Sequence, residues 1–432
     1  MLDIQFVREN QELVQTKAKQ KGYDVNVHDL LEYDDRRRSL VTEIEKLRAE
    51  RNELSATLKG GKPAPEQIEQ GKQLKEKIAA LETELKPVEE DFEKLLKAIP
   101  NMPLEDVPIG ASEDENKIAK RVGDPKEYDF TPKNHWEIAE PRDLLDKERA
   151  AKISGSRFAY IKGDLVRLQF AIIQFVLQTL GDEKVLEKLV KENNLHISTK
   201  PFTPVLPPAM LRTEPYVASA RLNAEEVTYK IEQDDLWLNA SAEHTLCTMY
   251  WNEILPEDMF PIRYIGYSTS FRREAGTYGK DTEGMIRLHQ FDKLEMEVFS
   301  TPETGLQEHF LQVAIQEYLV QQLGLPYQVL QKCTFDIGKP NARGIDIETW
   351  FPGQQKYRET HTADYMTDYQ ARDLKIRVRR SSGNTELVHT NDATAFAMSR
   401  ILAAIIENNQ TADGHFTVPK VLQPFMGGQA EI

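Results

Sequence analysis

Apolar residues from about residue 30 to residue 99 repeat by alternating steps of four and three positions, which is a heptad spacing. The second half of this stretch has the more regular seam, at Leu74, Ile78, Leu81, Leu85, Val88, Phe92, Leu95 and Ile99. The first half has a weaker seam, at Tyr33, Leu40, Ile44, Leu47, Leu54 and Leu58, where Arg37 and Arg51 must direct their charged ends to solvent. The pattern predicts two amphipathic helices of the coiled-coil type.

The two seams are separated by the segment GGKPAP at residues 60–65, whose glycines and prolines end one helix and permit a reversal. The sequence therefore predicts an antiparallel helical hairpin roughly 45 Å long. Residues 46–77, near the turn, carry eight Lys or Arg against five Glu, whereas residues 30–99 carry 14 against 16 acidic residues. A basic tip is compatible with RNA binding, but many such hairpins are spacers or dimerisation elements.

A second pattern begins beyond Pro100, after a linker rich in Pro and Asp. Strand-like runs at residues 263–271, 284–299 and 346–352, with helices expected at 165–180 and 303–323, indicate an antiparallel sheet flanked by helices. We therefore expect an α+β fold with two domains, at residues 1–108 and 109–432.

Composition narrows the class of protein further. Apolar residues make up 40% and charged residues 29% of the 432 residues, which is typical of a folded protein. The net charge of −15 argues against indiscriminate nucleic-acid binding, so any RNA contact must be local. Cys247 and Cys333 are the two cysteines, and their spacing fits neither a disulfide framework nor a zinc site. The most apolar stretch, residues 168–181, is too short to span a bilayer, and a cytoplasmic protein is expected.

Residues 286–298 separate two faces by alternation. Ile286, Leu288, Leu294, Met296 and Val298 share one face, and Arg287, His289, Phe291, Lys293, Glu295 and Glu297 share the other. An exposed sheet face would explain the charges. It would not explain Phe291, because an aromatic ring among charges suits stacking on a base.

Two other segments place arginine where it could bind phosphate. Residues 271–284, FRREAGTYGKDTEG, form a loop rich in glycine and charge, and Arg400 lies in an apolar helical run. A guanidinium can hold an oxyanion through two parallel hydrogen bonds. For Arg400 an internal salt bridge is an equal alternative. The sequence has neither a Rossmann nor a Walker A glycine pattern, so any ATP would be held in another way.

These segments resemble the three signature motifs of class II aminoacyl-tRNA synthetases, and among them those of the seryl-tRNA synthetase family. The resemblance extends over nearly the whole chain, from the predicted hairpin through residues 135–168 to ENNQ at 407–410. It implies an enzyme that activates L-serine with ATP and Mg²⁺ and transfers serine to the 3′-terminal adenosine of tRNA(Ser). It also implies a homodimer, in which Pro208 resembles the first-motif proline at the interface.

The resemblance assigns roles to individual residues. Arg272 matches an arginine that binds the α-phosphate and Arg400 one that binds the γ-phosphate, and both are expected to be catalytic. The other residues expected to bind ATP are Arg273, Glu274, Phe291, Glu359, Thr360, His361 and Thr362, with Glu274 reading the adenine and Phe291 stacking on it. The residues expected to bind serine are Ser241, Ala242, Glu243, Arg272, Glu295 and Thr394. Glu359 and Thr362 are the expected Mg²⁺ ligands.

Several positions depart from the family pattern. Arg273 stands where the family usually has Ser, and Glu-Ile/Val-Ser-Ser-Cys-Ser-Asn becomes residues 359–365, with His361, Asp364 and Tyr365 as the main changes. In the third motif, Asn-Gly-Thr becomes Asp392, Ala393 and Thr394. These departures bear on the fine geometry of the site and on amino-acid selectivity.

Two other functions share parts of this pattern. A ligase that loads a small amino acid onto a carrier protein would resemble the catalytic domain but lack the hairpin. A non-catalytic RNA-binding relative would have no need to retain Arg272, Glu274, Phe291, Glu295, Glu359 and Arg400 together.

Overall fold

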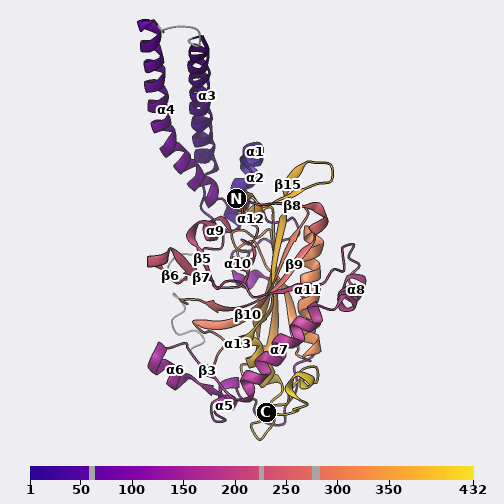
Figure 1. Cartoon of the computed structure of the whole chain (residues 1–432). Coiled ribbons are helices and arrows are strands. Elements are labelled where there is room, and N and C mark those ends of the chain that lie inside the picture. The colour runs from indigo at the N-terminus through magenta and orange to yellow at the C-terminus, as the bar shows by residue number, and fades with distance from the viewer. Residues whose placement is uncertain (58–63, 223–227, 275–282) are drawn as a thin grey trace. The chain divides into compact units, whose positions relative to one another are not determined.

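The computed structural model describes residues 1–57, 64–222, 228–274 and 283–432. The chain forms two compact units, Met1–Met102 and Pro103–Ile432 (Figure 1). Most of the expected turn of the hairpin and most of the loop after Glu274 lie outside the described residues. No helix of the described part of the chain is both long and apolar enough to cross a membrane.

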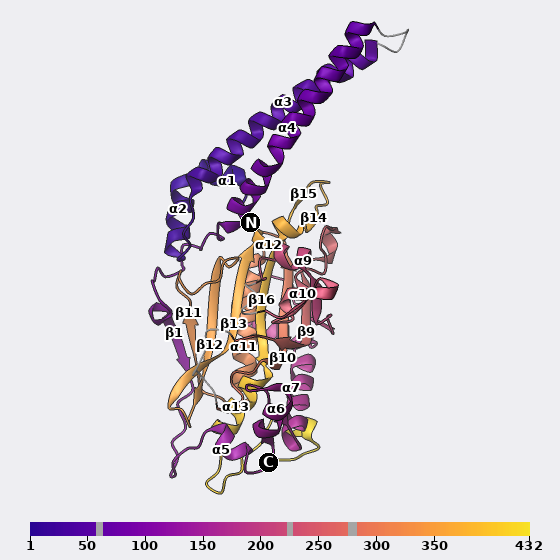
Figure 2. The same ribbon diagram turned by 90° about the vertical axis from the view of Figure 1, so that its left-hand side faces the viewer.

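The N-terminal unit is helical. Its elements are α1 (Ile4–Glu9), α2 (Gln11–Gln20), α3 (Val27–Thr57) and α4 (Pro65–Ala98). Helices α3 and α4 lie side by side (Figure 2). The seam residues Leu40, Ile44, Leu74, Ile78 and Val88 are buried. The predicted helical hairpin is confirmed.

Arg37 shows how a charged residue occupies a seam position. Its guanidinium carbon lies 4.5 Å from the centre of the Phe92 ring, and its Nη2 lies 2.7 Å from Oδ1 of the buried Asp34. The aliphatic part of the side chain can therefore cover the seam while the charge is balanced beside it. Arg51 is half-buried at a seam position nearer the turn.

The second unit is built on an eight-stranded sheet in the order β1-β11-β12-β13-β16-β10-β9-β4 (Figure 2). The strands are β1 (Lys117–Val122), β4 (Thr203–Val205), β9 (Ile262–Phe271), β10 (Gln290–Ser300), β11 (Tyr327–Gln331), β12 (Arg343–Phe351), β13 (Lys356–Thr367) and β16 (His389–Ala397). All neighbours are antiparallel except β4 and β9. The expected α+β fold is confirmed.

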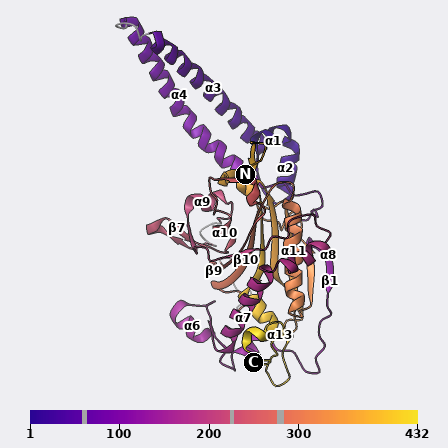
Figure 3. The same cartoon turned by 45° about the vertical axis from the view of Figure 1, so that its right-hand side comes forward.

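The helices that share one apolar core with the sheet include α7 (Asp164–Leu180), α11 (Gly305–Gln322) and α13 (Met398–Asn408). The residues of β10 in this core are Leu294, Met296 and Val298, as their alternation predicts. Short helices α9 (Thr213–Ala218) and α10 (Glu243–Leu246) lie on the side of the sheet opposite α11 (Figure 3). Glu295 and Glu297, on the other face of β10, are buried as well.

The remaining elements are shorter. The other α-helices are α5 (His135–Ala139), α6 (Lys147–Ser154), α8 (Glu183–Glu192) and α12 (Tyr369–Leu374). The other strands are β2 (Leu145–Asp146), β3 (Tyr160–Ile161), β5 (Met210–Arg212), β6 (Lys230–Ile231), β7 (Leu236–Leu238), β8 (Ile254–Pro256), β14 (Arg377–Arg379) and β15 (Thr385–Leu387).

Register shifts interrupt several ladders of the sheet, among them those of β10 with β16 and of β12 with β13. Between β10 and β16, Leu294 pairs with Phe396 and Glu295 with Thr394, so the register skips residue 395. Between β12 and β13, Ile347 pairs with His361 and Glu348 with Glu359, so the register skips residue 360. Each extra residue changes which side chains of β16 and β13 share a face.

Candidate active site

A cavity of about 130 Å³ lies where β9 ends, β10 begins and α13 starts. Its walls combine basic, acidic, hydroxyl, aromatic and aliphatic side chains. The lining residues are Arg272, Glu274, Ile286, Arg287, Leu288, Phe291, Lys293, Glu359, Thr360, Thr362, Thr394, Ala397, Ser399 and Arg400. The structure thus brings together residues from the separate segments that the sequence singled out.

Arg272 follows the last residue of β9 and is held at both its backbone and its side chain. Its amide N donates to the carbonyl oxygen of His289 at 2.9 Å, and its Nε donates to the carbonyl oxygen of Ala240 at 3.2 Å. The guanidinium carbon lies 5.3 Å from the centre of the Phe291 ring. A cation and an aromatic ring therefore meet at one wall of the cavity.

Glu274 contributes a carboxylate to the same wall. Its Oε2 accepts a hydrogen bond from Nη1 of Arg287 at 2.6 Å, and its carbonyl oxygen accepts one from Nη1 of Arg157 at 3.3 Å. The backbone at Glu274 has a φ of 53°, in the left-handed region that few non-glycine residues adopt. These contacts hold the carboxylate at the point where the chain leaves the described part of the loop.

Arg400 and Glu359 form an ion pair at the cavity wall. Nη1 of Arg400 donates to Oε1 of Glu359 at 2.9 Å and to its carbonyl oxygen at 2.8 Å. Arg400 lies in the first turn of α13, near its beginning and not in the middle of the apolar run as its sequence position suggested. Partial desolvation would raise the pKa of Glu359, whose side chain is 49% exposed, but Arg400, Lys332 and Arg272 outweigh this effect and lower the pKa, so the carboxylate is ionised.

His361 and Arg273 do not line this cavity. The bulge at Thr360 lets Glu359 and Thr362 reach the cavity wall, whereas the ring centre of His361 lies 5.3 Å from that of Phe396. Burial lowers the pKa of His361 to about 3, which keeps the imidazole neutral. The guanidinium carbon of Arg273 lies 5.6 Å from the centre of the Tyr229 ring.

A buried polar cluster adjoins the cavity through Lys293 and Thr394. Nζ of Lys293 lies 2.5 Å from Oε2 of Glu295 and donates to Oγ of Ser241 at 3.1 Å. Oγ1 of Thr394 donates to both Oε atoms of Glu295 at 3.4 Å, and Oγ of Ser241 lies 3.4 Å from its Oε2. The fully buried Glu295 thus meets one ammonium group and two hydroxyl groups.

The Glu243 side chain enters the cluster from the first residue of α10. Its Oε2 accepts a hydrogen bond from Oγ of Ser241 at 3.2 Å. Its neighbour His244 lies 3.5 Å away, measured from Nε2 to Oε1. Burial lowers the pKa of His244, so the ring is neutral. Ala242, which precedes Glu243, is fully buried and does not line the cavity.

Glu295 has an altered proton affinity. Burial raises its pKa, Lys293 opposes the rise, and the nearby Glu243 adds to it, with a result of about 7. The ordinary value of a glutamate is 4.5. The carboxyl group of Glu295 therefore changes its charge close to neutral pH.

Two basic residues of the cluster were not among the expected site residues. Lys293 was noted as part of the polar face of β10, and its position two residues before Glu295 was the available signal. Arg221 carries no local signal, because it lies after α9 and contacts residues of α10 and β16. Its partners are distant in the sequence.

The antiparallel sheet, with two arginines and an aromatic ring around a cavity next to a buried acidic cluster, is that of a class II aminoacyl-tRNA synthetase. Residues 228–409 match the family described as "tRNA synthetase class II core domain (G, H, P, S and T)". Residues 1–103 match the "Seryl-tRNA synthetase N-terminal domain". The chain is 38% identical to the serine--tRNA ligase of Syntrophotalea carbinolica, and the match covers 100% of both chains. The chain belongs to the seryl-tRNA synthetase family.

Solved structures agree with this assignment. The chain matches a seryl-tRNA synthetase from Pyrococcus horikoshii complexed with ATP, at a TM-score of 0.87 and 36% identity, covering 100% of this chain and 99% of the other. It also matches a cytoplasmic serine-tRNA ligase from Naegleria fowleri in complex with AMP, at a TM-score of 0.84 and 28% identity, covering 100% and 98%. The predicted family is therefore confirmed.

The raised pKa of Glu295 predicts a pH-dependent cost to stability. A carboxyl group that ionises near pH 7 when folded and near 4.5 when unfolded destabilises the fold progressively between these values, by about 3 kcal/mol in total. Glu295→Gln should remove this slope. Unfolding of Pro103–Ile432 can be followed by fluorescence, because Trp136, Trp237, Trp251 and Trp350 all lie in this unit. If the free energy of unfolding changes with pH from 5 to 8 in the same way for the two proteins, the prediction is contradicted.

Proposed function

We propose that the chain is a serine--tRNA ligase, which forms seryl-adenylate from L-serine and ATP and then transfers serine to the 3′-terminal adenosine of tRNA(Ser). Membership of the family supports the reaction. The observation that carries the assignment of this site is that basic residues and an acidic residue with a hydroxyl group meet at one cavity. Arg272 and Arg400 line one cavity, and the carboxylate of Glu295 lies beside the hydroxyl of Thr394, which lines the same cavity.

The nucleotide half of the cavity suits the charge of ATP. Adenylate formation requires a carboxylate to attack a phosphorus atom surrounded by negative oxygens, so alignment and charge neutralisation dominate catalysis. In this proposal Arg272 binds the α-phosphate and Arg400 the γ-phosphate. Phe291 stacks on the adenine, and Glu274 accepts a hydrogen bond from its amino group. The placement of Arg272 beside the Phe291 ring supports this arrangement.

Glu359 and Thr362 are the proposed Mg²⁺ ligands. Their oxygen atoms are the hard donors that this ion prefers, and the lowered pKa of Glu359 supplies a negative charge. Oγ1 of Thr362 accepts a hydrogen bond from Nζ of Lys332 at 3.2 Å and retains a second lone pair. Bound Mg²⁺ would supply further charge neutralisation at the phosphate oxygens. Arg400 keeps Glu359 at the cavity wall until ligands bind.

Serine offers an ammonium group and one hydroxyl to the protein. We assign the ammonium to Glu295, assisted by Ser241 and Glu243, and the hydroxyl to Thr394. In the structure Glu295 already binds an ammonium, that of Lys293, which supports its use as a partner for a cation. Reading a hydroxyl through a buried hydrogen bond discriminates more strongly than an apolar pocket of the same size.

Pyrophosphate exchange tests both the activity and the role of Thr394. The unaltered protein should exchange pyrophosphate in the presence of serine. Thr394→Val should reduce its preference for serine over alanine by about 1–3 kcal/mol, because one buried hydrogen bond is lost. Thr394→Ser, which keeps the hydroxyl, is the matched control and should retain the preference. An unchanged preference in Thr394→Val would show that the hydroxyl is read elsewhere.

The helical hairpin formed by α3 and α4 is the proposed binding element for tRNA(Ser). The chain is acidic overall, so an RNA backbone would have to bind at a locally basic surface, and the tip of the hairpin is basic. Excision of residues 33–95 should therefore leave serine-dependent pyrophosphate exchange intact and abolish charging of tRNA(Ser). The tryptophan fluorescence melt of the second unit should be unchanged, which controls for misfolding. Normal charging by the shortened protein would refute the proposal, and transfer to a carrier protein instead of tRNA would favour the alternative ligase.

We also propose a homodimer formed through the catalytic unit. The chain around Pro208 exposes apolar side chains, with Leu206, just after β4, 80% exposed and Met210, the first residue of β5, 43% exposed. Exposed apolar residues that lie together favour a protein contact. Light scattering at micromolar concentration should give a mass near twice 49.6 kDa. A mass equal to that of one chain would contradict the dimer. Leu206→Glu should shift the protein from dimer to monomer.

A cytoplasmic location completes the proposal. The two cysteines, Cys247 and Cys333, are both buried and unbonded, as expected in a reducing compartment. Fractionation of cells that express the protein would place it in the soluble cytoplasmic fraction, and its recovery elsewhere would contradict this location.

A further inference from the structure

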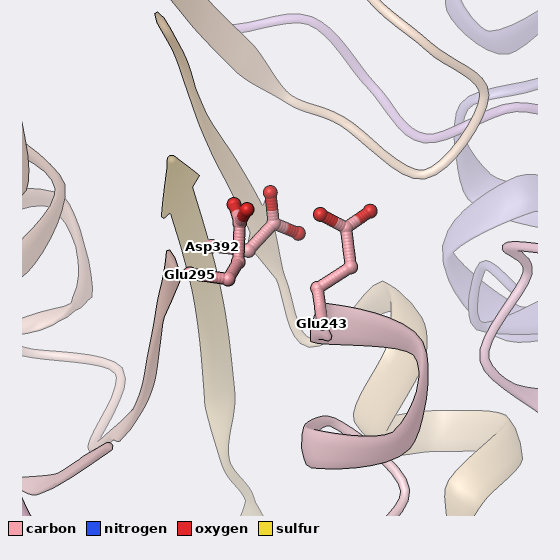
Figure 4. Close-up of side chains that lie close together, drawn as sticks. All are labelled: Glu243, Glu295 and Asp392. Carbon is pink, nitrogen blue, oxygen red and sulfur yellow. The ribbon is translucent and has the colours of Figure 1, made fainter. Parts of the chain in front are cut away.

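Arg221 reaches two carboxylates of the serine-side cluster at once. Its Nη2 bonds to Oδ2 of Asp392, and its Nε lies 3.4 Å from Oε1 of Glu243. The Arg221 side chain is only 13% exposed, and Glu243 and Asp392 are both buried. Figure 4 shows the side chains of Glu243, Glu295 and Asp392 turned towards one another from α10, β10 and β16.

Asp392 creates the need for a cation at this place. Across the ladders its register partners are Glu297 on β10 and Asp364 on β13, so carboxylates occupy neighbouring positions on three strands. Like charges directly opposite each other destabilise a sheet. Burial and the nearby carboxylates of Glu243, Asp364 and Glu295 raise the pKa of Asp392 well above its ordinary value, and Arg221 is the neighbour that opposes this rise. Burial and Asp392 raise the pKa of Glu297, which favours its neutral acid form.

Glu243 depends on the same guanidinium. Burial would raise its pKa, but Arg221, His244 and Lys293 outweigh burial and hold its pKa well below the ordinary value. Nε2 of His244 lies 3.5 Å from the same Oε1 of Glu243, whereas its Nδ1 lies 2.6 Å from the hydroxyl of Tyr216 and accepts a hydrogen bond from the amide N of Ala240. The proton of the neutral imidazole is therefore on Nε2, which faces Glu243. Arg221 therefore presents a positive charge to Glu243, and His244 presents its N–H group.

We propose that Arg221 is a positioning residue of the amino-acid site, which balances the carboxylate of Asp392 and holds Glu243 facing Glu295. This inference rests on the proposed function, because it assigns Glu243 and Glu295 to the serine ammonium. Asp392 stands where the family pattern has Asn, which needs no counter-charge. Arg221 and Asp392 thus form a charge pair at the side of the serine site.

A bound cation is the other occupant that three converging carboxylates suggest. Oxygen atoms of Glu243, Glu295 and Asp392 lie within 4.8 Å of one another. However, the cluster already contains two cations, because Nζ of Lys293 contacts Glu295 and Arg221 contacts Asp392. The two cations offset two of the three carboxylates, and the remaining negative charge is the one that the ammonium of serine balances in the proposed function, so we assign no metal to the cluster.

A double-mutant cycle at residues 221 and 392 tests the inference. The variants are Arg221→Gln, Asp392→Asn and the double substitution, each assayed by pyrophosphate exchange with serine and ATP varied separately. Arg221→Gln should raise KM for serine by roughly tenfold or more and leave KM for ATP within about twofold. When Asp392→Asn is already present, Arg221→Gln should raise KM for serine too, but by a ratio that is roughly one third of the ratio seen with Asp392. The reason is that the Asn side chain leaves no carboxylate without its cation.

The controls separate positioning from folding. Arg343→Gln is the matched control, since it removes a buried guanidinium that contacts Asp106 and His309 and none of the serine-side residues. It should leave KM for serine unchanged. Arg221→Lys keeps the charge but cannot bridge two carboxylates, so its KM for serine should lie between those of the unaltered protein and Arg221→Gln. If Arg221→Gln does not fold, Arg221→Lys compared in the two Asp392 backgrounds decides the question.

Two results would overturn the inference. One is an equal effect of the Arg221 substitution in both backgrounds, and the other is an equal rise in KM for serine and for ATP. Failure of the unaltered protein to exchange pyrophosphate with serine would instead refute the proposed function, so the two failures are distinguishable.

Discussion

Carboxylates that a sheet buries must be balanced by cations, and this requirement organises the centre of the catalytic unit. Lys293 contacts Glu295, Arg221 contacts Asp392, and Lys332 lies 3.3 Å from Oδ1 of Asp364, measured from Nζ. Each cation comes from outside the strand of its carboxylate except Lys293. Gly344, the register partner of Asp364, is part of the same solution, because a Cβ there would lie 2.5 Å from Cε of Lys332. Removal of one partner from such a pair usually costs more than the pair contributes, which makes these positions interdependent.

Much of the fold could be predicted because local periodicity determines it. The heptad seam predicted α3 and α4, and alternation predicted the core residues of β10. Alternation also extended the predicted strand back to Ile286, whereas β10 begins at Gln290. The difference arises because the segment before β10 bonds elsewhere: the amide N of Met285 donates to Nε2 of His135, and that of His289 to the carbonyl oxygen of Arg157. Periodicity reports which side chains are buried and does not report where the backbone hydrogen bonds go.

The site was predictable to the extent that its residues belong to recognisable segments. Arg272, Phe291 and Arg400 all line the cavity. The side on which His361 lies depends on the bulge at Thr360, and a bulge of one residue has no clear signal in the sequence. Arg221 illustrates a second limit, because it lies 171 residues from Asp392 along the chain. A buried charge pair of this separation becomes visible only when the fold brings its members together.

The contact between Arg400 and Glu359 has a consequence for how ligands enter. The two groups pair directly, so an anion that binds Arg400 alone would weaken the charge pairing of Glu359, and a cation that binds Glu359 alone would weaken that of Arg400. A ligand that carries both charges, such as a metal–nucleotide complex, exchanges one balanced pair for two. If metal and nucleotide bind at Glu359 and Arg400 as proposed, thermodynamic linkage would make the two affinities rise together by the same factor. The pairing of Arg400 with Glu359 would thereby favour binding of the complete complex over either of its components.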